Sequence, residues 1–284
     1  MLGLPKDFNT TTELKNKCER FKKLKYITME NQQLPNLNNN QLQVLLSARF
    51  GDGHIRKPKT STSNSLAQFS SVHAEYLDYK ADLLGDLCSS GYTTNKNGFA
   101  QKKIHTLYTK SLPEVTQIQK LTVTSTLKYL DELGLALWFY DDGSLHKRKL
   151  FYNLNTHSIS KETQELYIIP FLKKFNIHAK LTKEVKKDGR EFYYLRIGKF
   201  DGAYEISKIL RKYYVSCFDY KIWSSETTNL FGKLQAELKR KGAIITKKHM
   251  SLFLNRALKG ENVQDIVRSL EKSNASTIRW VDKK

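Results

Sequence analysis

The chain has 284 residues, which is enough for one large domain or two small ones. Its 48 Lys and Arg residues outnumber 28 Asp and Glu residues, and the net charge of +20 favours a polyanionic partner. No stretch approaches the roughly 18 apolar residues of a membrane-spanning helix, so we expect no membrane partner. A basic protein without a specific ligand is the remaining alternative on charge alone.

Targeting and redox features are sparse. The segment 1–15 lacks the basic-then-apolar order of a signal peptide. Cys18, Cys88 and Cys217 are widely spaced and form neither a zinc pattern nor a disulfide framework. We therefore expect an intracellular protein, in the cytoplasm of a bacterium or phage-infected cell or in an organelle, and not a secreted one.

The first half opens with an apolar segment, 41–53, that ends in the step Asp52-Gly53. It predicts a buried helix that stops at Gly53. The elements predicted after it are an extended segment at 54–57, a strand at 67–72, a helix at 74–89, two strands around the turn 95–98, and a helix beginning near Pro113.

The second half repeats this order. Another apolar helix, 133–143, ends in Asp142-Gly143, 90 residues after the first acidic position. The elements predicted after it are a basic turn at 146–149, a strand at 150–159, a helix at 161–176 capped by Ser160 and kinked at Pro170, a hairpin at 179–197, and a helix at 203–214. The pattern indicates an α+β protein with two αββαββα repeats.

Four regions follow: an N-terminal extension at 1–38, a first repeat at 39–125, a second repeat at 126–230, and a helical basic tail at 231–284. The tail carries 13 Lys or Arg and 5 Asp or Glu residues, a net of +8. Its segment 263–281 resembles a helix-turn-helix whose second helix opens at 276–281. A plain helical hairpin packed on the body is the open alternative.

Both acidic steps carry a family resemblance. Leu45–Gly53 and Leu135–Gly143 resemble the nine-residue LAGLIDADG motif, and the second is similar to the form Leu-Ala-x-Trp-Phe-Met-Asp-Asp-Gly of intron-encoded homing endonucleases. The segments 73–80 and 111–114 also look like that family, and the resemblance covers roughly residues 40–225. It implies a single-chain form with two pseudo-symmetric halves, motif helices packed at the centre, and sheets that form a saddle over DNA.

The resemblance also implies a site. The acid at the eighth motif position binds metal, which carries over to Asp52 and Asp142. A basic residue late in each half lies near the cleavage centre, and Lys120 and Lys221 occupy matching positions. The main-chain ligands implied with them are Gly51 and Asp141.

Departures from the motif are visible in the first half and beside Asp142. Arg49 stands where the motif is usually apolar, and Leu46 replaces a small residue, so we expect the first helix to pack less closely. Asp141 adds a carboxylate beside Asp142. Because helical neighbours point about 100° apart, both cannot occupy one site equally, and Asp141 is a spectator or tunes the field.

This residue set suits phosphodiester hydrolysis. Mg²⁺ or Mn²⁺ activates water and stabilises charge, and one or two carboxylates plus DNA phosphates suffice to hold it. Lys120 and Lys221 would polarise the attacking water or stabilise developing charge. The alternative for the two acids is that they end their helices without a function, although the helix dipole disfavours an acid there. The alternative for the two lysines is that they are ordinary solvated side chains.

Strands would read the DNA, since a β-ribbon fits the major groove. Some of these side chains must contact phosphates, which position the protein. The candidates for DNA contact are Arg56, Lys57, Lys59, Asn95, Lys96, Gln101, Lys103, His105, Lys147, Arg148, Lys149, Asn153, Asn155, Lys180, Lys183, Lys186, Arg190, Tyr194, Arg196, Thr277 and Arg279.

The sequence therefore predicts a monomeric homing endonuclease that cuts both strands of a long, asymmetric DNA site and leaves short 3′ overhangs, as the resemblance implies. An RNA-binding maturase that helps a host intron fold, or a cleavage-inactive DNA-binding protein on the same scaffold, remains open. The retained acids argue against simple binding. The termini, Met-Leu and Asp-Lys-Lys, lack splice-junction nucleophiles, so we expect no self-splicing.

Overall fold

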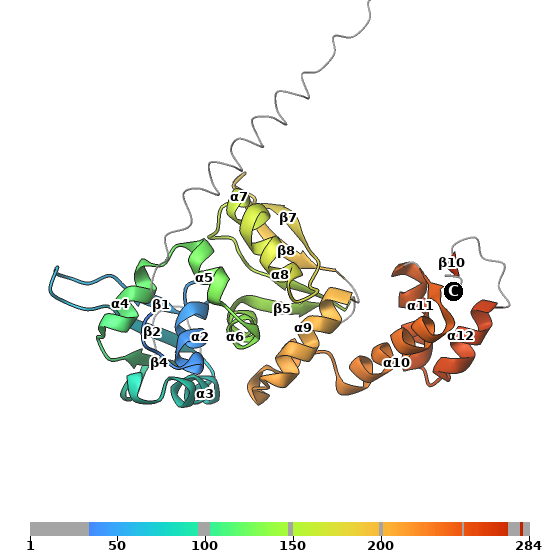
Figure 1. Ribbon diagram of the computed structural model, residues 1–284, viewed down its shortest axis with the longest axis horizontal. Coiled ribbons are helices and arrows are strands. Elements are labelled where there is room, and N and C mark those ends of the chain that lie inside the picture. Colours follow the sequence, from blue (N-terminus) through green and yellow to red (C-terminus); the bar gives the residue numbers. More distant parts are fainter. Residues whose placement is uncertain are drawn as a thin grey trace, which may run out of the picture.

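The computed structural model describes residues 34–95, 103–146, 150–198, 201–245, 247–271 and 279–280, arranged as two similar halves followed by a helical module (Figure 1). The first half comprises α2 (Asn39–Ser47), β1 (His54–Arg56), β2 (Leu66–Ser71), α3 (Ala74–Leu84), the 3-10 turn η1 (Gly85–Leu87), β3 (Cys88–Asn95), β4 (Ile104–Thr109), α4 (Pro113–Lys120) and α5 (Val123–Tyr129).

The second half and the module complete the chain. The second half comprises α6 (Glu132–Asp142), β5 (Gly143–His146), β6 (Phe151–Leu154), α7 (Lys161–Thr163), the π-helical turn η2 (Gln164–Ile168), α8 (Ile169–Lys173), β7 (Ala179–Val185), β8 (Glu191–Ile197), α9 (Asp201–Lys212) and the 3-10 turn η3 (Ser216–Lys221). The module comprises α10 (Ser225–Lys241), β9 (Ala243–Ile244), α11 (Lys247–Leu258), α12 (Val263–Glu271) and β10 (Arg279–Trp280).

Each half contains one four-stranded antiparallel sheet. The strand orders, β1-β2-β4-β3 and β5-β6-β8-β7, are the same when counted from the motif helix of each half. The predicted α+β class and the αββαββα repeat are therefore confirmed. No helix within the described ranges is long and apolar enough to cross a membrane.

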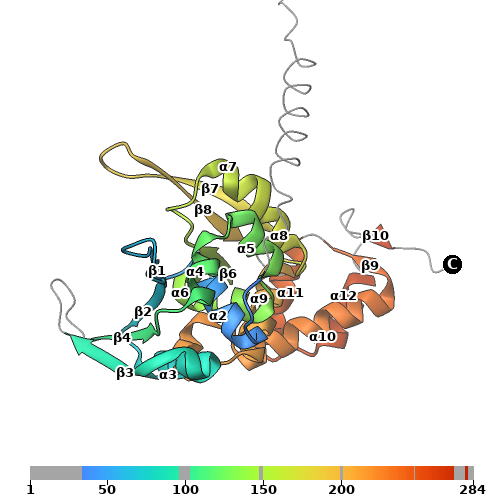
Figure 2. The same ribbon diagram turned by 60° about the vertical axis from the view of Figure 1, so that its left-hand side comes forward.

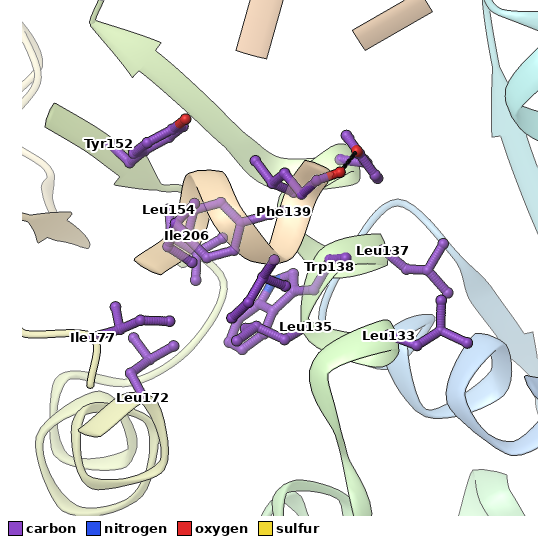
Figure 3. Packing of buried hydrophobic residues seen from close by; sticks show 14 of the residues in the cluster. Leu133, Leu135, Leu137, Trp138, Phe139, Tyr152, Leu154, Leu172, Ile177 and Ile206 are labelled. Carbon is purple, nitrogen blue, oxygen red and sulfur yellow. Dashed lines mark hydrogen bonds between the residues drawn. The ribbon is translucent and has the colours of Figure 1, made fainter. Parts of the chain in front are cut away.

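The helices cover one face of each sheet. In the second half, the register pairs Leu154 with Leu195 and Tyr152 with Ile197, and all four side chains are fully buried. They pack with Phe139 of α6, Ile206 of α9 and the residues Leu172 and Ile177 that follow η2 (Figure 3). Because strand side chains alternate between faces, the intervening residues point to the open side of the sheet.

The motif helices α2 and α6 pack together at the centre of the two halves (Figure 2). Gln43 of α2 is 1% exposed and bonds the chain just before α6, because its Nε2 donates to the Tyr129 carbonyl at 2.9 Å and its Oε1 accepts the Asp131 amide at 2.9 Å. Gly134 of α6 lies directly against the side-chain amide of Gln43. An added Cβ there would lie 2.5 Å from Oε1 of Gln43.

The first motif helix is shorter than predicted. α6 ends at Gly143 as expected, but α2 ends at Ser47 and not at Gly53. The physical reason is Arg49, whose guanidinium donates to the carbonyls of Gln119 at 2.7 Å and Leu121 at 2.8 Å at the end of α4. These bonds hold the chain in a turn after Ser47.

Other predicted boundaries also shift. The helix predicted at 74–89 stops at Leu84 because Gly85 takes a positive φ of 54°. The strand predicted at 150–159 is only four residues long, and the helix predicted at 161–176 is divided into α7, η2 and α8. α5 and α10 run across the predicted region limits at residues 125 and 230.

The tail differs from the predicted helix-turn-helix. The second helix predicted at 276–281 is wrong at its described residues, because Arg279 and Trp280 form strand β10, which pairs with β9. A helical pair does exist one helix earlier, where α11 and α12 are joined by a short turn at Gly260, φ 91°. Figure 1 shows α10, α11 and α12 gathered at one end of the molecule beyond α9.

Replacing Gly134 with Ala tests the close approach of α2 and α6. Alanine favours a helix by about 1 kcal/mol over glycine, but here its Cβ would meet Gln43 and the Leu130 side chain at 2.5 Å and 2.4 Å. Overpacking costs about 1–3 kcal/mol, so we expect the melting temperature to fall by several degrees in differential scanning calorimetry. An unchanged or higher melting temperature would contradict this packing.

Candidate active site

The ends of the two motif helices meet at a hollow of about 400 Å³. Its walls include Asp52 from the first half and Asp141 and Lys221 from the second. The contact between the halves is direct, because an added Cβ on Gly51 would lie 2.4 Å from Oδ2 of Asp141. Only glycine fits at this position without a shift of the neighbouring backbone or carboxylate.

Two of the three carboxylates at this point have no partner in the described part of the chain. Within the described ranges, neither the Asp52 nor the Asp142 carboxylate accepts a hydrogen bond or pairs with a cation. Desolvation and the nearby charges of Asp52 and Asp141 raise the pKa of Asp142 to about 7, although Lys221 and Lys80 act in the opposite direction. The pKa of Asp52 is raised by desolvation and by Asp141.

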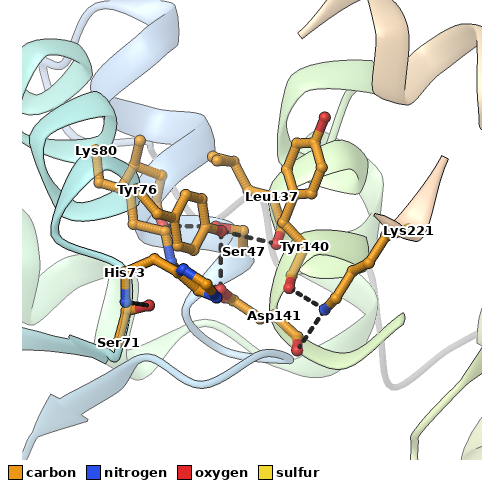
Figure 4. A network of polar contacts seen from close by, with 10 residues as sticks. Ser47, Ser71, His73, Tyr76, Lys80, Leu137, Tyr140, Asp141 and Lys221 are labelled. Carbon is orange, nitrogen blue, oxygen red and sulfur yellow. Dashed lines mark hydrogen bonds and ion pairs between the residues drawn. The ribbon is translucent and has the colours of Figure 1, made fainter. Parts of the chain in front are cut away.

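The third acid is fully engaged (Figure 4). The Asp141 side chain is 2% exposed and accepts bonds from Lys80 Nζ at 3.0 and 3.2 Å and from the Tyr76 hydroxyl at 2.8 Å. Asp141 as a whole is only partly buried, so its exposed portion is main chain. The side chain therefore has structural partners, and the carbonyl oxygen of Asp141 accepts a long hydrogen bond from Lys221.

Lys221 lines the hollow and Lys120 does not. Lys221 Nζ donates to the Tyr140 carbonyl and lies 3.4 Å from the Asp141 carbonyl. Burial lowers the pKa of Lys221, while the three nearby carboxylates raise it. Lys120 is exposed on the last turn of α4 and is not among the residues that line the hollow.

Lys80 is a cation beside these acids that sequence reasoning missed. It lies on α3 between Leu77 and Leu84, at spacings of three and four residues, and all three face the core. A lysine in the apolar stripe of a helix needs a buried partner, and this signal was available in the sequence. Tyr76 lies one turn earlier on the same face and is also buried.

Part of the predicted DNA-contact set lies on the open sheet faces. The register pairs Asn153 with Arg196 and Arg196 with Lys180, out of phase with buried Leu195. Arg56 bonds Gln68 and lies over the Tyr108 ring on the corresponding face of the first sheet. The described candidates on these open faces are Arg56, Asn153, Lys180, Tyr194 and Arg196.

The remaining candidates lie elsewhere. The register places His105 on the same sheet face as Leu107, and Lys183 on the same face as Leu181. The register therefore does not support DNA contact by His105 or Lys183. Exposed positions in loops and turns hold Lys57, Lys59, Lys103, Asn155, Lys186 and Arg190. The residues outside the described ranges are Lys96, Gln101, Lys147, Arg148, Lys149 and Thr277, and Asn95 and Arg279 are placed only as strand residues.

The donor set fits a hard divalent cation. Asp52 and Asp142 offer unpartnered carboxylates, and Asp141 offers main-chain oxygen, which are ligands that Mg²⁺ and Mn²⁺ accept. No group of three or more His, Cys, Asp or Glu side chains in the described part of the chain forms a metal cage. Magnesium needs none, because it usually keeps several waters and takes further oxygens from substrate phosphates.

Comparison with known proteins identifies the family. The model of the LAGLIDADG DNA endonuclease family matches residues 42–203, more than half of the chain, and the protein belongs to this family. The resemblance of the two motif segments is thereby confirmed. The structure of the homing endonuclease I-WcaI bound to its DNA recognition sequence is similar in fold, with a TM-score of 0.55 at 20% identity, over 78% of this chain and 96% of that one.

Curated relatives match smaller parts of this chain. Cytochrome b mRNA maturase bI2 of Saccharomyces cerevisiae is 26% identical over 208 residues, which are 66% of this chain and 48% of the maturase. Probable intron-encoded DNA endonuclease 3 of Mycosarcoma maydis is 26% identical over 107 residues, 37% of this chain and 74% of the relative. Other curated matches span between 16% and 28% of those proteins' length.

Asp142→Asn should stabilise the metal-free protein. A carboxyl whose folded pKa is raised to about 7 destabilises the fold once ionised, so the cost is absent below its unfolded pKa, grows as pH rises, and is complete above pH 7. Allowing for solvent access, we expect a gain of about 1 kcal/mol, or about 2–4 °C, at pH 8 in EDTA, and less at pH 5.

The matched control is Asp188→Asn. Arg190 lowers the pKa of this exposed carboxylate, so removing its charge should not stabilise the protein. Calorimetry of both variants at both pH values tests the difference. A gain for Asp142→Asn that is equal at pH 5 and pH 8 would exclude the charge at this site as its cause.

Proposed function

We propose that this protein is a metal-dependent, site-specific endonuclease that acts as a monomer and cuts both strands of a long, asymmetric DNA duplex. The observation that carries the proposal is that Asp52 and Asp142, whose carboxylates have no partner among the described residues, come together where the two halves join. A protein that only binds DNA gains nothing from two neighbouring carboxylates that repel phosphate.

Asp52 and Asp142, with the main-chain carbonyls of Gly51 and Asp141, would hold Mg²⁺ or Mn²⁺. Such a cation supplies an activated water and stabilises charge on the phosphate. Lys221 donates to the chain at the end of α6 and has a lowered pKa, so it is suited to exchange a proton with water or with the leaving oxygen. Its positive charge also offsets the negative charge that develops on the phosphate.

The open faces of the two sheets would bind the duplex. They present Arg56, Lys180 and Arg196 together with polar side chains that can bond base edges, as expected for β-ribbons in the major groove. The net charge of +20 supplies the attraction to phosphates. In the fold relative I-WcaI, a DNA recognition sequence is bound. The basic helical module from α10 onward would add affinity.

An intron maturase is the second candidate, because a relative similar over 66% of this chain is a cytochrome b mRNA maturase. Intron RNA would then be a partner in addition to DNA or in its place. A splicing assay with the host intron separates the two functions. Splicing that is unaffected by Asp52→Asn, in a chain that cuts no DNA, would favour the maturase.

Asp52→Asn and Asp142→Asn should each abolish double-strand cleavage while DNA affinity stays within about threefold. The amide keeps the shape of the side chain but loses the charge that holds a cation. The assay incubates each protein with Mg²⁺ and a library of long duplexes and sequences the cut ends. Cleavage by the wild type establishes the proposed function, and near-normal cleavage by either variant removes that acid from the metal site.

Lys221→Met and Lys120→Met separate the two lysine predictions. Because Lys221 lies beside the carboxylates and Lys120 is exposed on α4, we expect Lys221→Met to slow cleavage at least 100-fold, as removal of a catalytic acid–base group typically does. Lys120→Met should change the rate less than threefold. Equal, large losses in single-turnover rates would restore Lys120 to the site.

A further inference from the structure

Three carboxylates meet where the halves join, but only two of them are available to a cation. Asp52 and Asp142 have no partner within the described ranges. Both oxygens of Asp141 lie within 3.2 Å of Lys80 Nζ, and Oδ1 also accepts the Tyr76 hydroxyl. The difference between the acids therefore comes from two side chains of α3, and Lys80 is the one that carries a charge.

Lys80 has no other described polar partner. It is 2% exposed, so its ammonium does not reach solvent. Apart from Asp141, the cation lies over the rings of Tyr76 and Phe69, with 4.3 Å and 5.0 Å between Nζ and the ring centroids. Because the two rings cover the ammonium on its other sides, Nζ points at one carboxylate, that of Asp141.

Stability alone does not account for such a pair. Burying two charges costs several kcal/mol per ion, and replacing a buried ion pair with apolar residues is often neutral or stabilising. The pair also links the halves, because Lys80 lies on α3 of the first and Asp141 on α6 of the second. Its position beside Gly51, the residue before Asp52, points to a role in the site.

We propose that Lys80 is a positioning residue that holds the Asp141 carboxylate away from the metal site, so that only Asp52 and Asp142 serve the cation. This inference rests on the proposed function. Without Lys80, the Asp141 carboxylate would add a third negative oxygen donor beside the two ligands. A cation would bind more tightly, but in an altered ligand set that is less suited to hydrolysis.

The test compares Lys80→Met, Asp141→Asn and the double variant with the wild type. Isothermal titration with Mn²⁺ alone measures metal affinity on the free protein, and cleavage is timed at temperatures well below unfolding. We expect Lys80→Met to bind Mn²⁺ about tenfold more tightly and to cut at least tenfold more slowly, with DNA affinity within twofold. The double variant, in which no surplus carboxylate remains, should return towards wild-type values for both quantities.

Two controls keep the result interpretable. Lys173→Met removes an exposed cation from α8 and should change neither quantity. Because Lys80→Met leaves a buried charge unpaired and can fail to fold, Tyr76→Phe provides a milder release of Asp141. It should shift Mn²⁺ affinity two- to threefold in the same direction.

Three outcomes would overturn the inference. Lys80→Met could lower only the melting temperature and leave Mn²⁺ affinity and cleavage unchanged, which indicates a purely structural pair. Lys80→Met could shift Mn²⁺ affinity equally in the wild-type and Asp141→Asn backgrounds, which means that Lys80 does not act through Asp141. Tyr76→Phe could leave Mn²⁺ affinity unchanged. A wild type that binds Mn²⁺ but cuts no DNA refutes the proposed function instead, and the affinity comparison still tests Lys80.

Discussion

The close packing of Gly51 against the carboxylate of Asp141 sets the geometry of the whole molecule. It requires a residue without a side chain at one motif end and a side chain held still at the other. With that contact made, α2 and α6 lie together, Asp52 and Asp141 line one hollow, Asp142 is close enough for its charge to interact with theirs, and each sheet extends outward from its own motif helix. The two halves therefore share one centre, and their buried apolar side chains form one continuous core.

The two halves are equivalent in topology but not in chemistry. α6 continues to Asp142, whereas α2 stops at Ser47 and Arg49 turns away to bond the end of α4. Only the second half carries a paired carboxylate next to its metal-binding candidate. Fusion of both halves in one chain permits these differences, because each half can change without imposing the same change on the other.

The repeat and the central acids were predictable because they depend on local patterns: apolar helices that end at an acid and glycine, and strands that alternate. Arg49 shows where that reasoning stops, since its partners are carbonyls about 70 residues away and no local pattern announces them. Lys120 was chosen by its place in the chain, while the buried cation is Lys80, on another helix. The tail was misread because β10 pairs with a strand 36 residues earlier.

The ion pair across the halves also limits recombination. In a hybrid that joins the first half of one family member to the second half of another, position 80 and position 141 would come from different parents. A hybrid whose first half supplies an apolar residue at position 80 would inherit Asp141 without its counter-charge, with a cost of about 3–5 kcal/mol. Compatible parents must therefore match at this pair as well as along the surface where α2 meets α6.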